Sequence, residues 1–208
     1  MSLFITFEGE EGSGKTFQTR ALYRRLGGLA IPALLTHEPG GTVAGEKIAR
    51  WLKWAHDAGI SALSELLMFN ASRAQLVEEV IQPGLKSGKV VICDRFADST
   101  IAYQGYGRCL DLEMVKAVNH TATRGLKPGL TILLDLPFEA GLARKINRKH
   151  DRFERETIAF HRRVRQGYLK LAAEEPGRWL VIDASQSKEK ISKIVWQRVS
   201  GLLHGHVG

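Results

Sequence analysis

The chain has 208 residues, a formal net charge of +8 and 44% hydrophobic residues. This is enough apolar material for one substantial core and predicts a single domain over 1–208. No apolar run approaches the roughly 20 residues that a membrane-spanning helix needs. The two cysteines, Cys93 and Cys109, form neither a disulfide framework nor a metal-binding spacing. The composition argues against membrane-spanning and disulfide-stapled classes and predicts a cytoplasmic protein.

The positive charge by itself permits three kinds of partner: nucleic acid, an anionic surface or a polyanionic small substrate. Basic residues are densest over 144–155, but an enzyme that handles several phosphates also needs many cations. No stripe of aromatic residues alternates with basic ones, as single-stranded nucleic acid would favour. We therefore expect a small polyanionic substrate, and neither nucleic acid nor a membrane as partner.

A phosphate-binding loop follows the first apolar run, 3–7. Gly9, Gly14, Lys15 and Thr16 fit the spacing G-x-x-x-x-G-K-[ST]. Glycines let successive backbone N–H groups turn toward phosphate oxygens, and the N-terminus of the next helix adds positive potential. Lys15 is expected to reach the outer phosphates and the Thr16 hydroxyl to bind Mg²⁺. The loop predicts binding of a nucleoside triphosphate.

The remaining elements alternate between apolar runs and helical periodicity. Apolar runs that end in polar residues predict buried parallel strands at 32–36, 89–94, 130–136 and 178–183. Helical patterns lie at 15–26, 43–56, 60–87, 97–105, 111–124, from 137 into the basic segment, 153–174 and 187–203. Alternating strands and helices require right-handed crossovers with helices on both faces of a parallel sheet. The predicted class is α/β.

Several further motifs point to one family. They are 7–16 around the phosphate loop, Glu38-Pro39-Gly40-Gly41-Thr42, Phe69-Asn70-Ala71-Ser72-Arg73, Asp94-Arg95-Phe96 with 98–105, and Asp151-Arg152-Phe153-Glu154. In this order, along nearly the whole chain, the sequence resembles the bacterial thymidylate kinase family. The resemblance implies a P-loop three-layer fold with a five-stranded parallel sheet and a short basic lid at about 141–155. It also implies a homodimer that transfers the γ-phosphoryl of ATP to dTMP, giving dTDP and ADP for dTTP synthesis.

The resemblance assigns roles at the donor end of the site. ATP is expected to bind along Gly9, Glu10, Glu11, Gly12, Ser13, Gly14, Lys15 and Thr16. Thr16 and Asp94 are expected near Mg²⁺, although Asp94 could equally cap and orient its neighbours. Because Gly12 stands where some members carry an arginine, the lid must supply the cation. The lid candidates are Arg144, Arg148 and Arg152, which join Lys15 and Arg95 as predicted catalytic residues.

At the acceptor end, the resemblance places Arg95 on the dTMP phosphate, where a planar fork binds better than an ammonium. Phe69 is similar to the aromatic that stacks on thymine. Arg73, one helical turn further, shares its face and reaches the base edge. Tyr103 matches the residue whose bulk rejects a ribose 2′-hydroxyl. Glu11 at the sugar 3′-hydroxyl, with Glu38, Pro39, Ser99 and Gln104, completes the predicted acceptor site.

Two alternatives to a thymidylate kinase stay open on the sequence. One is a kinase for another acceptor, such as a different nucleotide or a deoxynucleoside. The other is a non-catalytic nucleotide-binding or nucleic-acid-associated module, suggested by a pI near 9.7. The sequence also leaves the helix at 60–87 ambiguous, because Leu63, Leu66 and Leu67 fit a dimer interface and a core equally well.

Overall fold

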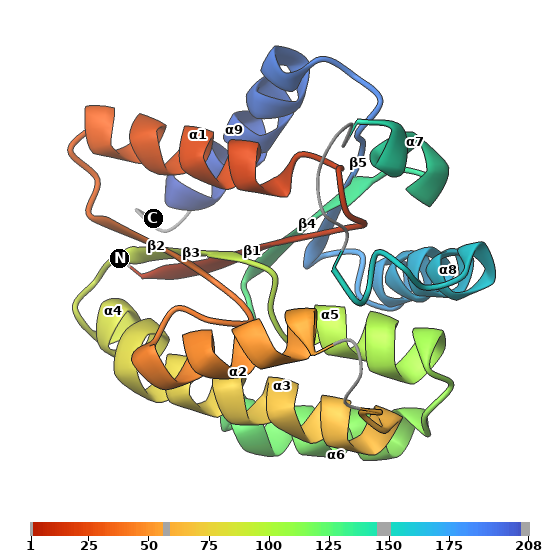
Figure 1. The fold of residues 1–208 in the computed structure, drawn as a ribbon. Helices are drawn as coiled ribbons and strands as arrows, with labels where there is room; N and C mark the ends of the chain where they lie inside the picture. The colour runs from red at the N-terminus through yellow and green to blue at the C-terminus, as the bar shows by residue number, and fades with distance from the viewer. Residues whose placement is uncertain (1, 56–58, 145–150, 205–208) are drawn as a thin grey trace.

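Five parallel strands form the centre of the protein in the computed structural model, which describes residues 2–55, 59–144 and 151–204 (Figure 1). The strands are β1 (Leu3–Glu8), β2 (Ala33–His37), β3 (Val90–Asp94), β4 (Leu130–Asp135) and β5 (Trp179–Asp183), in the spatial order β2-β3-β1-β4-β5. All four neighbouring pairs are parallel. The structure confirms the predicted α/β class and the five-stranded sheet.

Helices cover both faces of this sheet. The α-helices of the described residues are α1 (Lys15–Gly28), α2 (Val43–Trp54), α3 (Ala62–Leu76), α4 (Gln82–Lys86), α5 (Ala97–Thr100), α6 (Leu112–Thr123), α7 (Phe138–Ala143), α8 (Ile158–Glu174) and α9 (Lys188–His204). Two π-helical segments, η1 (Val77–Ile81) and η2 (Ile101–Gly107), continue α3 and α5. Helices α1 and α9 lie on one face, and α2, α3, α4 and α6 lie beyond the other (Figure 1). None of these helices combines the length and apolar content that crossing a membrane requires.

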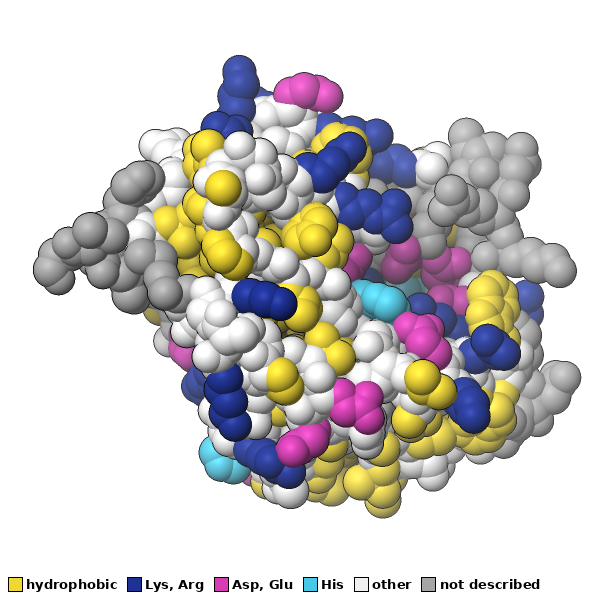
Figure 2. All heavy atoms as spheres, turned by 90° about the vertical axis from the view of Figure 1, so that its left-hand side faces the viewer, with side chains coloured by type: hydrophobic (Ala, Val, Ile, Leu, Met, Phe, Trp, Pro, Cys, Tyr) yellow, Lys and Arg dark blue, Asp and Glu magenta, His cyan; other side chains and the backbone are white. Residues whose placement is uncertain are grey.

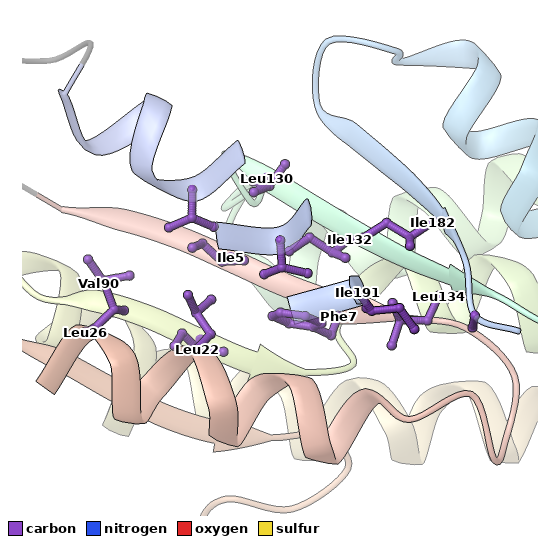
Figure 3. Packing of buried hydrophobic residues seen from close by; sticks show 14 of the residues in the cluster. Ile5, Phe7, Leu22, Leu26, Val90, Leu130, Ile132, Leu134, Ile182 and Ile191 are labelled. Carbon is purple, nitrogen blue, oxygen red and sulfur yellow. The ribbon is translucent and has the colours of Figure 1, made fainter. Parts of the chain in front are cut away.

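The alternation of side chains along β1 divides the core into layers. Ile5 and Phe7 point toward α1 and α9, where they pack with Leu22 and Ile191 (Figure 3). Phe4 points the other way and packs in a second cluster around α3 and η1. Each fully buried side chain of this size contributes about 1.5–3 kcal/mol relative to exposure. The apolar layers hold the carboxyl ends of β1 and β3 side by side, and the functional loops start there.

Helical periodicity predicted one helix over 60–87, and the structure divides it. Helix α3 ends at Leu76, η1 widens the next turn, and α4 follows. Pro83 in α4 has no N–H to donate to the preceding turn, so the regular hydrogen-bond ladder cannot run through it unchanged. Leu66 is fully buried, while Leu63 and Leu67 are 47% and 50% exposed. Of these three residues, only Leu66 belongs to the core.

The predicted helix over 153–174 begins five residues later than expected. The Asp151 carboxylate accepts hydrogen bonds from the backbone N–H groups of Phe153 (2.9 Å) and Glu154 (3.0 Å), which fixes a turn. Thr157 then caps α8, its hydroxyl oxygen accepting from the N–H of Phe160. Such local side-chain bonds compete with the helix, and periodicity does not detect them. Helix α1, in contrast, continues through Gly27 and Gly28, where the sequence predicted a stop.

Candidate active site

The phosphate loop joins β1 to α1 and turns through three glycines with positive φ, Gly9 (134°), Gly12 (76°) and Gly14 (96°). The Lys15 ammonium lies inside the loop and donates to the carbonyls of Gly9 (3.1 Å) and Glu10 (2.9 Å). Burial and the nearby charge of Arg95 together lower the pKa of Lys15 to about 8, against the opposing effect of the Glu11, Asp94 and Glu10 carboxylates. An anion in the loop would favour the charged ammonium, so Lys15 is suited to receive phosphate.

Gly12 touches the backbone of α7 and leaves no space for a side chain. A Cβ at Gly12 would lie 2.2 Å from the Gly141 carbonyl oxygen, and a Cβ at Gly141 would lie 2.1 Å from the Glu11 carbonyl oxygen. The backbones of the phosphate loop and of α7 therefore meet at Gly12, the position at which some members of the family carry an arginine. An arginine at position 12 would not fit this packing, and a cation supplied from the lid stays a prediction.

We expect Gly12→Ala to raise the KM for ATP at least tenfold. The added methyl would force the loop or α7 to move, and it would also hold alanine at a φ that costs about 1–3 kcal/mol. Gly88→Ala is the matched control, because Gly88 has φ 75° and open space around its Cβ position. Thermal unfolding of this control measures the cost of placing alanine at a positive φ without a clash. The control should leave the KM for ATP unchanged. An equal KM for Gly12→Ala and wild type would show that the Gly12–Gly141 contact yields easily.

Asp94 and Arg95 end β3 directly beside the phosphate loop, since Phe7 pairs with Asp94 in the parallel register. The Thr16 hydroxyl donates to Asp94 Oδ2 at 2.7 Å. Within the described ranges no three His, Cys, Asp or Glu side chains come together as a metal site. Two adjacent oxygen donors still fit Mg²⁺, which keeps several waters and is often held by one or two protein oxygens plus phosphates. Thr16 and Asp94 therefore remain the residues that could hold it.

A cavity of about 1300 Å³ lies over the phosphate loop. Its lining includes Lys15, Thr16, Asp94 and Arg95, and also the loop after β5 at 184–188. This last segment was missed by the sequence reading, although the rule that ligands bind beyond the carboxyl ends of strands points to it. Figure 2 shows one face of the molecule, where acidic and basic side chains gather around a hollow.

A second cavity of about 400 Å³ adjoins the first, and all nine predicted acceptor residues line it. Unpredicted lining residues are Lys53, Trp54, Thr100, Asp151, Phe153, Glu154 and His161. The rings of Phe69 and Phe153 are 5.6 Å apart, and Tyr103 meets Phe153 edge-on at 6.2 Å. The two cavities share Glu11, Glu38, Lys53 and Arg95. Motifs distant in sequence therefore build two adjoining compartments.

Arg73 points inward from α3, and its side chain is fully buried. Its guanidinium donates to both carboxylate oxygens of Glu38 and to Asn119 Oδ1 (2.6 Å) and Thr100 Oγ1 (2.7 Å). Burial raises the pKa of Glu38, and the Arg73 charge opposes this. Phe69 and Arg73 share a cavity as predicted, but most Arg73 donors face protein. Contact between Arg73 and a base edge stays a prediction.

The three predicted lid arginines have different outcomes. Exposed Arg144 follows α7 and donates to the carbonyls of Gly12 (3.4 Å) and Ala184 (3.0 Å), next to the phosphate loop. Arg148 lies outside the described residues. Arg152 is turned away: its NH2 forms an ion pair with Glu65 Oε2 at 2.6 Å, although the N–H direction misses hydrogen-bond alignment. Its Nε donates to the Leu52 carbonyl at 3.0 Å, so Arg152 fastens the segment around Asp151–Glu154 to α2 and, through Glu65, to α3.

His161 of α8 links the phosphate loop to the turn that contains Phe153. Its Nδ1 lies 3.2 Å from Glu10 Oε2, its Nε2 lies 3.1 Å from the Phe153 carbonyl, and its ring stacks on Phe138 at 3.4 Å. No sequence motif indicates His161, because its partner in the phosphate loop, Glu10, lies 151 residues away in the chain. Only the fold reveals the contact.

Comparison with known proteins decides the family. A sequence profile described as thymidylate kinase matches residues 7–195 of this chain. The chain belongs to the thymidylate kinase family. It is 55% identical over 203 residues to a thymidylate kinase of Dehalococcoides mccartyi, covering 98% of both chains. It is 46% identical over 214 residues to a thymidylate kinase of Geotalea daltonii, covering 99% of this chain and 100% of the relative.

Family membership extends to the three-dimensional structure. The crystal structure of thymidylate kinase from Ehrlichia chaffeensis superposes with a TM-score of 0.73 at 37% identity, covering 87% of this chain and 92% of the other. These findings confirm the predicted family, the P-loop kinase fold and the enzyme class, a phosphotransferase of nucleotide biosynthesis. The chain is therefore an enzyme, and the alternative of a non-catalytic binding module loses its support.

Proposed function

We propose that this enzyme transfers the γ-phosphoryl of ATP to dTMP, giving dTDP and ADP, and that its two adjoining cavities hold the two substrates. The family and the names of its relatives support the reaction. The observation that carries the site is the shared wall: Glu11 and Arg95 line both cavities. Two nucleotides bound on either side of this wall would bring their phosphates together.

In the larger cavity, the glycines of the phosphate loop and Lys15 would bind the ATP phosphates. Thr16 and Asp94 would hold Mg²⁺, which would neutralise charge on the transferring phosphoryl group. Arg144 is the described lid cation nearest the loop, and Arg148 is the second proposed contact by family resemblance. Arg152 is assigned the different task of fastening the lid to α3 through Glu65. A cation from the lid would complete the site as the segment closes.

In the smaller cavity, Arg95 would bind the acceptor phosphate, and the adjoining rings of Phe69 and Phe153 would form the aromatic wall against which the base lies. Tyr103 lies against the expected sugar position and excludes a 2′-hydroxyl by its bulk. Glu11 at the cavity junction would accept from the 3′-hydroxyl. Glu38, Pro39, Arg73, Ser99 and Gln104 form the remaining wall.

The proposed chemistry needs no general base. A phosphate monoester has a second pKa near 6, so at neutral pH the acceptor arrives mostly as a dianion and is already a nucleophile. The obstacle is repulsion between two anions, and Lys15, Arg95 and a lid arginine surround the junction with positive charge. Fixing the acceptor oxygen in line with the γ-phosphorus supplies most of the remaining acceleration.

The proposal also includes a single domain over 1–208 and a cytoplasmic location, both inferred from composition, and a homodimer, which the resemblance implies. Exposed Leu63 and Leu67 of α3 are available for an interface, whereas buried Leu66 is not. Their contribution to a dimer follows from exposure of apolar side chains on one helix.

Coupled ATP turnover with Mg²⁺ tests the acceptor, using dTMP, dUMP, UMP, dCMP and thymidine in parallel. We expect kcat/KM for dTMP to exceed that for UMP by at least two orders of magnitude, because UMP differs at two points: it lacks the 5-methyl group, worth roughly 10–200-fold, and it adds a 2′-hydroxyl, worth about 100-fold. Phosphorylation of thymidine but not dTMP would keep the fold and replace the acceptor assignment. A folded protein that binds ATP and phosphorylates none of the five would contradict the proposed reaction.

A further inference from the structure

Tyr168 lies in the middle of α8, outside every motif that predicted the site. Its ring is 1% exposed and packs with Leu133, Phe160 and Val164. Its hydroxyl reaches out of this apolar cluster into a polar one beneath the cavity junction. A buried tyrosine hydroxyl normally has a definite partner. Here it has several.

Three polar groups meet the Tyr168 hydroxyl. It donates to Glu8 Oε2 at 3.0 Å, accepts from Arg95 NH1 at 3.1 Å and lies 2.8 Å from the Ser99 hydroxyl oxygen. Ser99 duplicates the arrangement, because its hydroxyl donates to Glu8 Oε2 at 2.5 Å and accepts from Arg95 NH1 at 3.2 Å. Two hydroxyls therefore bridge the same guanidinium nitrogen to the same carboxylate oxygen.

The chemistry of the groups fixes the direction of these bonds. A guanidinium only donates, an ionised carboxylate only accepts, and a hydroxyl does both. With Glu8 ionised, hydrogen bonds run from Arg95 through the two hydroxyls to Glu8 without conflict. Bonds to charged groups are about twice as strong as neutral ones. NH1 of Arg95 is thereby committed to the protein.

The other end of the same guanidinium is held loosely. NH2 lies 3.4 Å from the Tyr103 hydroxyl and 3.5 Å from Glu11 Oε2, and both residues line the acceptor cavity. The backbone of Arg95 has a φ of 73°, a left-handed conformation that is unusual for arginine. A long side chain on such a residue needs outside contacts to keep one orientation. Those contacts come from Tyr168 and Ser99 on the NH1 side.

We propose that Tyr168 is a positioning residue for acceptor binding, holding Arg95 so that its NH2 edge faces the acceptor phosphate. The inference rests on the proposed function, because it takes Arg95 as the phosphate contact. Tyr168 itself does not line either cavity. Tyr168 acts through its hydrogen bond with Arg95, and the Glu8 carboxylate holds the Tyr168 hydroxyl in place.

Glu8 makes this arrangement sensitive to its surroundings. Its carboxylate also accepts from the Phe96 N–H at 2.8 Å and is fully buried between β1, β3, α5 and α8. Burial and the Asp98 charge raise the pKa of Glu8 to about 7, although Arg95, Ser99 and the Phe96 N–H oppose the rise. Removing the Tyr168 hydroxyl takes a donor from the carboxylate, which must raise the pKa of Glu8 again.

Tyr168→Phe tests the proposal because it keeps the packed ring and deletes only the hydroxyl. We expect the Kd of dTMP, measured by titration calorimetry without ATP, and the KM of dTMP to rise roughly tenfold, the effect of losing one hydrogen bond to a charged group. The KM of ATP should change less than about twofold. The acid limb of the pH profile of kcat/KM for dTMP should move to higher pH. A residue with only a structural role would lower the active fraction and leave both KM values and the limb in place.

Tyr106→Phe is the matched control, since its ring packs on Gly167 of the same helix and it lines neither cavity. It should leave the Kd of dTMP unchanged. If Tyr168→Phe does not fold, Glu8→Gln removes the anchoring charge instead. It should weaken dTMP binding and leave only the acid limb of the dTMP phosphate itself, whose second pKa is near 6.

Unchanged dTMP binding in a folded Tyr168→Phe protein would overturn the inference while leaving the proposed function intact. Wild-type protein that binds dTMP but does not phosphorylate it would overturn the proposed function, and the calorimetric comparison would still decide the role of Tyr168. Wild-type protein that does not bind dTMP would overturn both.

Discussion

Arg95→Ala is expected to lower kcat/KM for dTMP by roughly three orders of magnitude, while the Kd of ATP changes little. Removing a charged donor that stabilises a transferring phosphoryl group costs on the order of 10³ in rate in related chemistries. The side chain is also the wall shared by the two cavities. Its loss would let the acceptor phosphate lie in more than one position, which adds an entropic cost to the electrostatic one.

Two further variants sharpen the result for Arg95. Arg95→Lys keeps the charge but cannot contact Ser99, Tyr168 and phosphate at once, so its kcat/KM should fall between wild type and alanine. Arg124→Ala is the matched control. Arg124 is another arginine with positive φ (53°), but it pairs with Glu78 on the surface, where the ion pair is 64% and 55% exposed. Its replacement should leave turnover unchanged. Joint loss of ATP binding and thermal stability in Arg95→Ala would instead assign Arg95 to folding.

The pH dependence of stability gives Glu8 a separate signature. Its pKa is about 7 in the folded protein against 4.5 unfolded, so the folded state binds the extra proton between these values. Stability that Glu8 contributes at low pH is therefore lost as pH rises from 4.5 through 7. This difference in pKa corresponds to a change of about 3 kcal/mol in the free energy of unfolding. Glu8→Gln should flatten this part of the stability profile.

How much the sequence predicted depends on how local each feature is. The position of the phosphate loop between a strand and a helix was predicted, because spacing alone places Lys15 and Thr16 on the first turn of the helix. Strand ends were predicted because an apolar run closed by polar residues, such as Asp94, marks them. Parallel pairing then brings these ends to one edge, and this is why separate motifs converge on two cavities.

Features that depend on tertiary contact were missed or placed differently. Arg152 looked like a lid cation because it lies in a basic segment, but buried Glu65, far away in sequence, pairs with it. Tyr168 looked like one more residue of an amphipathic helix, and nothing local marks its hydroxyl. The contact between Gly12 and Gly141 joins two predicted segments, the phosphate loop and the helix that starts after Pro137, but neither pattern shows that their backbones meet. Each case turns on one specific distant partner, and composition and periodicity carry no information about partners.

Arg73→Ala is expected to give the largest loss of stability, about 3–5 kcal/mol, because it leaves Glu38 buried without its cation. In a protein of this size each kcal/mol lowers Tm by about 2–4 °C, so we expect Tm to fall by roughly 6–20 °C. The loss should grow with pH. Without Arg73, burial raises the pKa of Glu38 unopposed, and a raised carboxyl pKa in the folded state removes stability as pH increases.

Two comparisons separate the charge from the packing around Arg73. Arg162→Ala breaks an exposed pair with Glu139 and should change the free energy of unfolding little. The double variant Arg73→Met with Glu38→Gln replaces the buried pair by groups of similar volume and should recover part of the loss, since the desolvation cost of both charges disappears. The dTMP affinity of this double variant decides whether Arg73 also contacts the base edge. Recovered stability with weakened dTMP binding would place the guanidinium at the base edge, as the resemblance implies. Recovery of both would make the Arg73–Glu38 pair a support for the acceptor cavity and not a contact within it.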